Sequence, residues 1–104
     1  MRIAITGGTG FIGSHLVRSL VTCGNRVRCL LRPNSDRSQL PKNVEHVITD
    51  DLTDMTRLFQ LCRDTDAVVH VAGLTRSNDS NELFRVNHRG TSNLIAAYIR
   101  TSPR

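Results

Sequence analysis

The stretch Ile5–Gly13, ITGGTGFIG, constrains the fold of this 104-residue chain more than any other part of it. Four glycines occur among its nine residues, directly after the short apolar run of residues 2–6, which is typical of a β-strand. In the segment 11–24 that follows, apolar residues recur at helical spacing: Ile12, Leu16, Leu20 and Cys23. Gly24 then provides a common C-terminal stop. The pattern predicts a strand that turns sharply into an amphipathic helix.

Strand-like and helix-like periods alternate along the rest of the chain. Further strands are predicted over residues 26–31, 44–49 and 66–73, and further helices over residues 55–62 and 83–102. Thr53 or Asp54 is expected to cap the helix over 55–62. The polar segment 32–43 contains two prolines and is predicted to be a loop with room for one helical turn.

This order of elements predicts one α/β domain over residues 1–104. Strands that alternate with helices form a parallel sheet with right-handed crossovers most simply, here with strand order 3-2-1-4. The nearly unbroken apolar run of residues 66–73 is typical of a parallel strand that is covered on both faces. Such a sheet binds ligands beyond the carboxyl ends of its strands, at the switch point between the first and fourth strands. The glycine-rich turn falls at that point.

Composition excludes several classes of protein. The net charge is +5, but the basic residues occur singly and without interleaved aromatics, so no nucleic-acid partner is expected. We expect a cytoplasmic protein without a membrane partner, because the sequence shows neither an apolar run of bilayer length nor an export signal. Cys23, Cys29 and Cys62 lack metal-ligand spacing and are predicted to be buried, reduced thiols. The four histidines show no metal-ligand spacing either, so no metal site is expected.

The glycines of the turn predict a site for a diphosphate. Gly7 allows a sharp turn out of the strand, Gly10 lets the backbone approach a ligand closely, and Gly13 lets the helix pack closely. The first amides of the helix, at the positive end of its dipole, would then face the phosphates. The simpler alternative is an ordinary strand-to-helix turn without a ligand.

With these residues, the sequence resembles the extended short-chain dehydrogenases/reductases, which include NAD(P)-dependent epimerases, dehydratases and reductases. TGGTGFIG (6–13) matches the glycine signature of that family. DDLTD (50–54), VVHVAG (68–73) and RVNHRGTSNLIAA (85–97) agree with it in order and distance. The resemblance implies a Rossmann-type doubly wound sheet. His88 departs from the apolar residue that is more usual there, and we expect it on the exposed face of its helix.

The resemblance also implies the residues that bind the cofactor. Around the diphosphate it places Gly7, Thr9, Gly10, Phe11, Ile12 and Gly13. Asp51 is expected to accept a hydrogen bond from the adenine amino group, with Leu52 beside it. Beneath the ribose and nicotinamide it places Val71, Ala72 and Gly73. Asn87 is expected to brace the junction of strand and helix. For Asp51, the alternative is a residue that merely approaches a helix N-terminus.

Arg32 bears on the choice between NADP and NAD. Enzymes selective for NAD usually end the second strand with Asp or Glu, whereas Arg near this position accommodates the 2′-phosphate of NADP. Here Arg32 follows the strand, and Asn34, Ser35 or Arg37 could add donors. NADP is therefore favoured. NAD remains the alternative because Asp36 lies near, and Arg32 could simply be a solvated side chain at a strand end.

The Tyr-x-x-x-Lys pair that the resemblance implies for catalysis is not in this sequence, so no catalytic residue is predicted. Thr101 and Ser102 follow Tyr98, and Lys42 is the only lysine. We therefore expect the N-terminal cofactor-binding part of an epimerase/dehydratase-like oxidoreductase, truncated after the fourth strand and its helix. The alternative is a non-catalytic nucleotide-binding or redox-sensing module. An open edge at the fourth strand would favour self-association or marginal stability.

Overall fold

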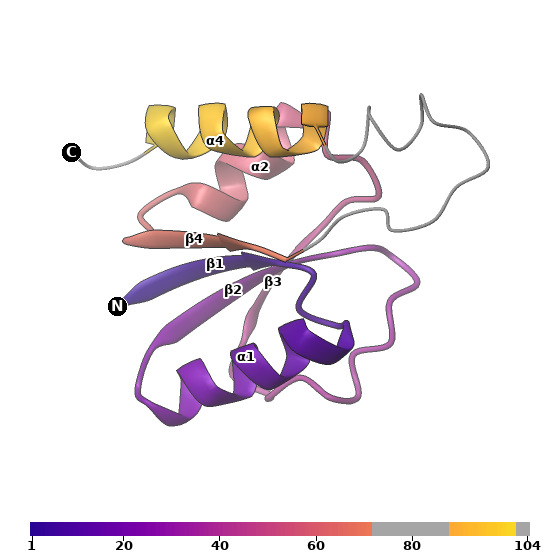
Figure 1. The fold of residues 1–104 in the computed structure, drawn as a ribbon, viewed down its shortest axis with the longest axis vertical. Coiled ribbons are helices and arrows are strands. Elements are labelled where there is room, and N and C mark those ends of the chain that lie inside the picture. The colour runs from indigo at the N-terminus through magenta and orange to yellow at the C-terminus, as the bar shows by residue number, and fades with distance from the viewer. Residues whose placement is uncertain (72–87, 102–104) are drawn as a thin grey trace.

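The computed structural model describes residues 1–71 and 88–101. Its elements are β1 (Arg2–Thr6), α1 (Phe11–Thr22), β2 (Arg26–Leu31), β3 (Glu45–Ile48), α2 (Met55–Cys62), β4 (Ala67–His70) and α4 (Gly90–Thr101). The four strands form a parallel sheet in the order β3-β2-β1-β4, which confirms the predicted topology. Helix α1 covers one face of the sheet, and α2 and α4 cover the other (Figure 1).

Side chains of the central strands alternate between two apolar cores. Ala4 and Leu30 belong to the core beneath α2 and α4, together with Leu58, Leu61 and Leu94. Residues that point to the opposite face form the core under α1: Ile3, Ile5, Val17, Val27, Cys29, Leu31 and Val44. This division follows from the period of two in a strand, which sends successive side chains to opposite faces. Both faces of the sheet are thus covered, as the apolar strands predict.

The buried face of α1 differs in part from the predicted one, because Leu16 and Leu20 pack against the core as expected but are only partly buried. Gly13, Ser14 and Val17 are its buried residues, whereas Ile12 is 70% exposed and Cys23 is exposed as well. The reason is the contact at Gly13, which brings this side of the helix against the glycine turn. Residue 12 lies about 100° around the helix from residue 13, so its side chain points away from the core.

Most other local predictions are confirmed. Asp54 caps α2 by accepting a hydrogen bond from the backbone N–H of Arg57, at 3.3 Å. Gly24 follows α1 with a φ of 89°, a left-handed conformation that suits glycine at a helix end. His88 is exposed, as expected. Of the predicted helix over 83–102, the structure has Gly90–Thr101 as α4, while residues 83–87 lie outside the described residues.

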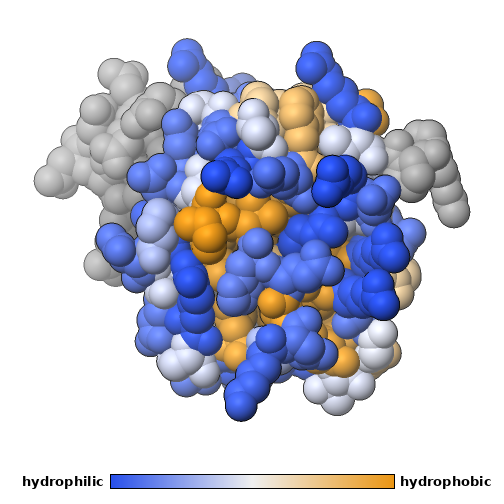
Figure 2. Space-filling model, turned by 180° about the vertical axis from the view of Figure 1, so that it is seen from behind, coloured by the Kyte–Doolittle hydropathy of each residue, from blue (hydrophilic) through white to orange (hydrophobic). Residues whose placement is uncertain are grey.

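The surface is mainly hydrophilic on the face opposite to that of Figure 1, with smaller apolar patches between the polar side chains (Figure 2). Within residues 1–71 and 88–101, no helix is long and apolar enough to cross a membrane.

Candidate functional site

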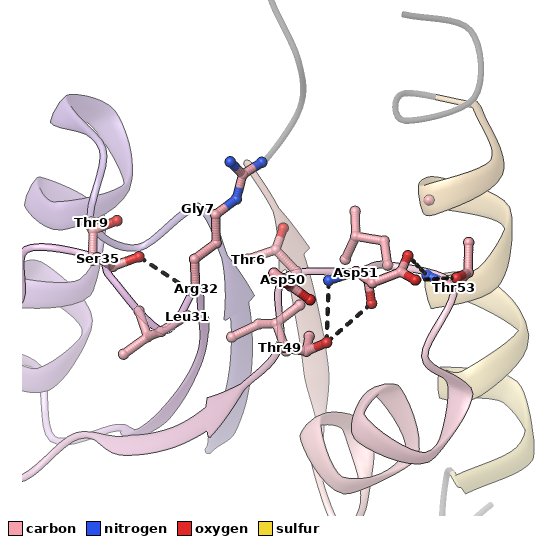
Figure 3. A pocket seen from close by; sticks show the side chains of 13 residues that line it. Thr6, Gly7, Thr9, Leu31, Arg32, Ser35, Thr49, Asp50, Asp51 and Thr53 are labelled. Carbon is pink, nitrogen blue, oxygen red and sulfur yellow. Dashed lines mark hydrogen bonds between the residues drawn. The ribbon is translucent and has the colours of Figure 1, made fainter. Parts of the chain in front are cut away.

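A cavity of about 460 Å³ opens at the carboxyl ends of β1, β2 and β3. The residues that line it are Thr6, Gly7, Thr9, Leu30, Leu31, Arg32, Ser35, Thr49, Asp50, Asp51, Leu52, Thr53 and Gly90. Figure 3 shows Thr9, Ser35 and Arg32 on one side of this cavity and Asp51 and Thr53 on the other, with Thr6 and Asp50 between them. The cavity therefore lies where parallel α/β sheets bind their ligands.

The glycine turn is closed tightly at two of its glycines, Gly7 and Gly13. Gly7 has a φ of 78°, in the left-handed region, and its carbonyl accepts a hydrogen bond from Gly10 N at 3.2 Å. A Cβ on Gly13 would lie 1.8 Å from the carbonyl oxygen of Gly7. Gly13 is thus required by the backbone of the turn itself. The sequence had indicated close packing against the sheet instead.

The N-terminus of α1 has no side-chain cap. Gly10 is the N-cap residue, and its carbonyl accepts the first hydrogen bond of the helix from Ser14 N at 2.8 Å. The amides of residues 11–13 precede that bond, so they have no acceptor within the helix. The first turn also lacks an acidic residue. This helix end therefore presents N–H groups without an acceptor in the helix, at the positive end of the helix dipole. Both features favour the binding of an anion.

A compact turn over residues 49–53 carries Asp51. The two carboxylate oxygens of Asp51 accept hydrogen bonds from the N–H of Thr53, at 2.8 Å, and from its hydroxyl, at 2.6 Å. Thr49 Oγ1 accepts from Asp51 N at 3.2 Å (Figure 3). These contacts hold the Asp51 carboxylate in one orientation at the rim of the cavity, although the residue itself is exposed.

Arg32 lies at the opposite side of the cavity. Its backbone N–H donates to Ser35 Oγ at 3.1 Å, which closes a turn directly after β2 (Figure 3). Its guanidinium makes no hydrogen bond or ion pair within the described ranges 1–71 and 88–101. Asp36 does not line the cavity, and Ser38 N donates to its carboxylate at 2.9 Å. That hydrogen bond, with one from the Ser38 side chain, lowers the pKa of Asp36.

The ends of β1 and β4 are joined at the switch point of the sheet. Thr6 Oγ1 and His70 Nδ1 form a hydrogen bond at 2.5 Å, and Thr6 is fully buried. Burial lowers the pKa of His70, because it disfavours the charged imidazolium. Next to this pair, Val71 N donates to the carbonyl of Thr6 at 3.1 Å.

The cavity gathers five of the residues predicted for the cofactor site: Gly7, Thr9, Arg32, Asp51 and Leu52. Four others, Gly10, Phe11, Ile12 and Gly13, form the end of the turn and the start of α1. Val71 lies at the end of β4. Ala72, Gly73 and Asn87 lie outside the described residues.

Sequence reasoning missed several residues at this site, among them Thr49, Gly90 and Asn93. Thr49 follows β3 and Gly90 begins α4, and both line the cavity. Asn93 Nδ2 donates to the carbonyl of Leu52 at 3.0 Å. Thr49 could have been found from its place after a predicted strand, since parallel strands end at one edge. The contacts of Gly90 and Asn93 bridge about 40 residues and have no local signal in the sequence.

In the described part of the chain, no group of three or more His, Cys, Asp or Glu side chains is arranged to hold a metal ion.

Comparisons with known proteins agree with this geometry. Residues 3–104 match the model of the NAD dependent epimerase/dehydratase family. Ceramide reductase of Caulobacter vibrioides is 38% identical over 88 residues, which cover 85% of this chain and 28% of that protein. A putative dihydroflavonol 4-reductase of Synechocystis is 36% identical over 94 residues, which cover 88% of this chain and 27% of that protein.

A solved structure shows the same fold. The UDP-glucose 4-epimerase of Thermus thermophilus, in complex with NAD, superposes with a TM-score of 0.83 and 33% identity. The match covers 97% of this chain and 34% of the epimerase. This chain thus spans about a third or less of the length of these relatives.

Proposed function

The chain belongs to the NAD dependent epimerase/dehydratase family, and we propose that it binds a nicotinamide dinucleotide across the carboxyl ends of β1, β2 and β3. One observation carries this proposal. The uncapped N-terminus of α1 lies next to a cavity of about 460 Å³ that has Arg32 on one side and Asp51 on the other. Relatives of this family have been solved with NAD bound, among them the Thermus thermophilus epimerase.

The diphosphate is assigned to the start of α1. Backbone groups of Gly7, Gly10 and residues 11–13 would surround it, and the Thr9 hydroxyl would add a donor. No charged side chain is needed there, because the helix dipole and several oriented N–H groups already favour an anion. Phe11 and Ile12 support this role through their backbone, since their side chains are 82% and 70% exposed.

The adenine is assigned to the turn over residues 49–53. An ionised carboxylate accepts hydrogen bonds and donates none, so Asp51 suits the amino group of adenine. The two contacts from Thr53 support this assignment, because they fix the carboxylate before a ligand arrives. Leu52 would lie beside the base, and Val71, Ala72 and Gly73 would pass beneath the nicotinamide half.

NADP is the favoured cofactor, and Arg32 is the reason. Its guanidinium has no partner among the described residues and can form a charge-assisted pair with a 2′-phosphate. Asp36, the nearest carboxylate after β2, is held by Ser38 and does not line the cavity. NAD recognition through that carboxylate is therefore the weaker alternative.

A calorimetric titration with NADPH and NADH tests both the binding and the preference. The wild-type chain is expected to bind NADPH more tightly. Arg32→Asp should weaken NADPH binding about tenfold or more, since a hydrogen bond to a charged group contributes about 1.5–3 kcal/mol. Arg26→Asp makes the same change of charge at the start of the same strand and should leave both affinities unchanged. Absence of binding would refute the function, whereas an unchanged preference in Arg32→Asp would refute only the role of Arg32.

For the full-length protein we propose hydride transfer on a sugar-nucleotide or small carbonyl substrate, with catalytic residues outside this chain. A non-catalytic nucleotide-binding or redox-sensing module is the second candidate, because the same nucleotide-binding fold supports both functions. The two candidates differ in one readout. The enzyme would oxidise or reduce its bound nicotinamide when substrate is added, and the sensor would not.

A further inference from the structure

Helix α4 contacts the turn over residues 49–53 at two points. Gly90, at the start of the helix, lies so close to Leu52 that an added Cβ would be 2.7 Å from Leu52 Cδ1. One turn later, the Asn93 amide donates a hydrogen bond to the backbone carbonyl of Leu52, with an Nδ2–O distance of 3.0 Å. Residues 41 positions apart in sequence are thereby joined at the rim of the cavity.

The hydrogen bonds within the turn give it its shape. Thr49 Oγ1 contacts both the N–H and the carbonyl of Asp51, at 3.2 and 3.3 Å, and Thr53 contacts both carboxylate oxygens. All these partners lie within five residues of one another, so they would move together with the turn. The position of the turn relative to the cavity must come from contacts with other elements.

Two contacts of Leu52 supply that position. Its side chain packs against the apolar core beneath α2 and α4, and this contact fixes how close the turn lies to the core. Its backbone is held by Asn93, and a carbonyl held by a fixed donor cannot rotate without losing that hydrogen bond. The Leu52 carbonyl shares its peptide plane with the N–H of Thr53, which donates to the Asp51 carboxylate at 2.8 Å. Rotation of that peptide would therefore break this contact and release the Asp51 carboxylate.

We infer that Asn93 is a positioning residue for adenine recognition. It acts through the Leu52 carbonyl on the carboxylate of Asp51 and does not contact the ligand itself. This inference rests on the proposed function, in which Asp51 accepts a hydrogen bond from the amino group of adenine. Substitution of Asn93 should therefore reduce the preference for adenine over a base that lacks the amino group.

Two dinucleotides isolate that effect. NADP⁺ and nicotinamide hypoxanthine dinucleotide phosphate differ at position 6 of the purine, where the second carries oxygen in place of the amino group. The wild-type chain is expected to bind NADP⁺ about tenfold more tightly, as suits one hydrogen bond to a charged acceptor. Asn93→Ala removes the donor. Asn93→Asp keeps the size of the side chain but places an oxygen against the Leu52 carbonyl.

Both variants should lower the preference for adenine at least threefold, with the affinity for the hypoxanthine dinucleotide changed less than twofold. Ser92→Ala, at an exposed position in the same turn of helix, is the matched control and should keep the wild-type ratio. Thermal unfolding of each variant is measured in parallel by circular dichroism.

Three results would overturn the inference: an unchanged ratio in both variants, a parallel loss of affinity for both dinucleotides, or loss of cooperative unfolding in both variants. The last two would mean that Asn93 supports the fold as a whole. Failure of the proposed function has a different signature. In that case the wild-type chain would bind neither dinucleotide. Equal binding of both by the wild-type chain would refute the assignment of the adenine amino group to Asp51.

Discussion

At the scale of single residues, burial separates the three cysteines into two chemical classes. Cys29 and Cys62 are fully buried, and burial raises the pKa of each thiol to about 11. Cys23 is exposed at the end of α1, contrary to the sequence prediction. Only thiolates react rapidly with alkylating agents, so Cys29 and Cys62 should be inert in the folded chain.

We predict that iodoacetamide at pH 8 labels Cys23 alone in the native chain and all three cysteines in denaturant. Mass spectrometry of the intact chain and of its peptides checks the number and the place of the labels. Rapid native labelling of Cys29 would contradict the packing of α1 and the glycine turn against the sheet, because Cys29 Sγ lies 3.1 Å from the position of a Cβ on Gly8.

Two glycines of the turn should respond differently to alanine. At Gly13 a Cβ would overlap the Gly7 carbonyl at 1.8 Å, so Gly13→Ala should destabilise the fold by about 1–3 kcal/mol or more. At Gly10 the nearest atom would be 3.5 Å away, and its φ of −74° suits alanine. Gly10→Ala should therefore fold normally but lose affinity for the dinucleotide, since its Cβ would hold off the diphosphate.

Urea unfolding and calorimetry with NADPH separate the two effects. Wild-type affinity in Gly10→Ala would contradict the place assigned to the diphosphate, and wild-type stability in Gly13→Ala would contradict the geometry of the turn.

At the scale of elements, Arg28 of β2 holds the C-terminus of α2. Its Nη1 donates to the carbonyls of Gln60, Leu61 and Arg63, at 2.8–3.0 Å. Its Nε donates to Glu45 at 3.0 Å, and the Arg28 side chain is 20% exposed. A cation at this helix end satisfies carbonyls that have no partner within the helix and interacts favourably with the dipole.

Arg28→Met keeps the length of the side chain and removes the donors, and it should lower the free energy of unfolding by about 2–3 kcal/mol. The control is Glu45→Gln, because the Glu45 side chain is 59% exposed and should contribute less than about 1 kcal/mol. Urea unfolding of both variants is the measurement. Equal losses would mean that the ion pair matters and the helix end does not.

Burial of His70, which bonds β4 to β1, predicts that the stability of the fold depends on pH. Burial lowers the pKa of His70 in the folded chain, so the unfolded chain binds a proton first as the pH falls below about 6.5. Stability should therefore decrease from pH 7 downward, until the folded pKa is passed. His70→Gln should remove this part of the slope in urea unfolding between pH 7 and pH 5. An unchanged slope in the variant would assign the effect to another group.

The helices and strands follow closely from the sequence. The departure at the first turn of α1 has a physical cause. The strands, the cap at Asp54 and the stop at Gly24 depend on local patterns, so they could be predicted. The exposure of Ile12 on α1 could not, because the contact between Gly13 and Gly7 rotates this residue away from the core. A close approach of two backbones outweighs the burial of one isoleucine side chain, which contributes about 1.5–3 kcal/mol.

At the scale of the whole molecule, β3 and β4 lie at the two edges of the sheet that the structure describes. All four residues of β4 are partly exposed. Unpaired edges with apolar side chains favour pairing with another chain. We predict that this polypeptide self-associates or is marginally stable. Sedimentation and thermal unfolding over a hundredfold range of concentration check this, and a sharp monomeric transition that is independent of concentration would contradict it.

Site residues that directly follow strands could be predicted from the order of the elements. Site residues that depend on packing between distant segments were missed. Gly7, Thr9, Arg32, Asp51 and Leu52 follow predicted strands, and parallel strands bring their carboxyl ends to one edge. Asn93, 41 residues after Leu52, holds the carbonyl of this cavity-lining residue from helix α4. A single polar residue in a helix carries no sign of which backbone carbonyl it will meet.

The central claim is that the first amides of α1 bind the diphosphate of a nicotinamide dinucleotide. A titration of the ¹⁵N-labelled chain with NADPH, followed by NMR, tests it most directly because each backbone amide is observed separately. We expect the largest shifts at Gly10, Phe11, Ile12 and Gly13, and none at Gly24 at the other end of the helix. Saturable shifts elsewhere with none at these amides, or no shifts at all, would contradict the account.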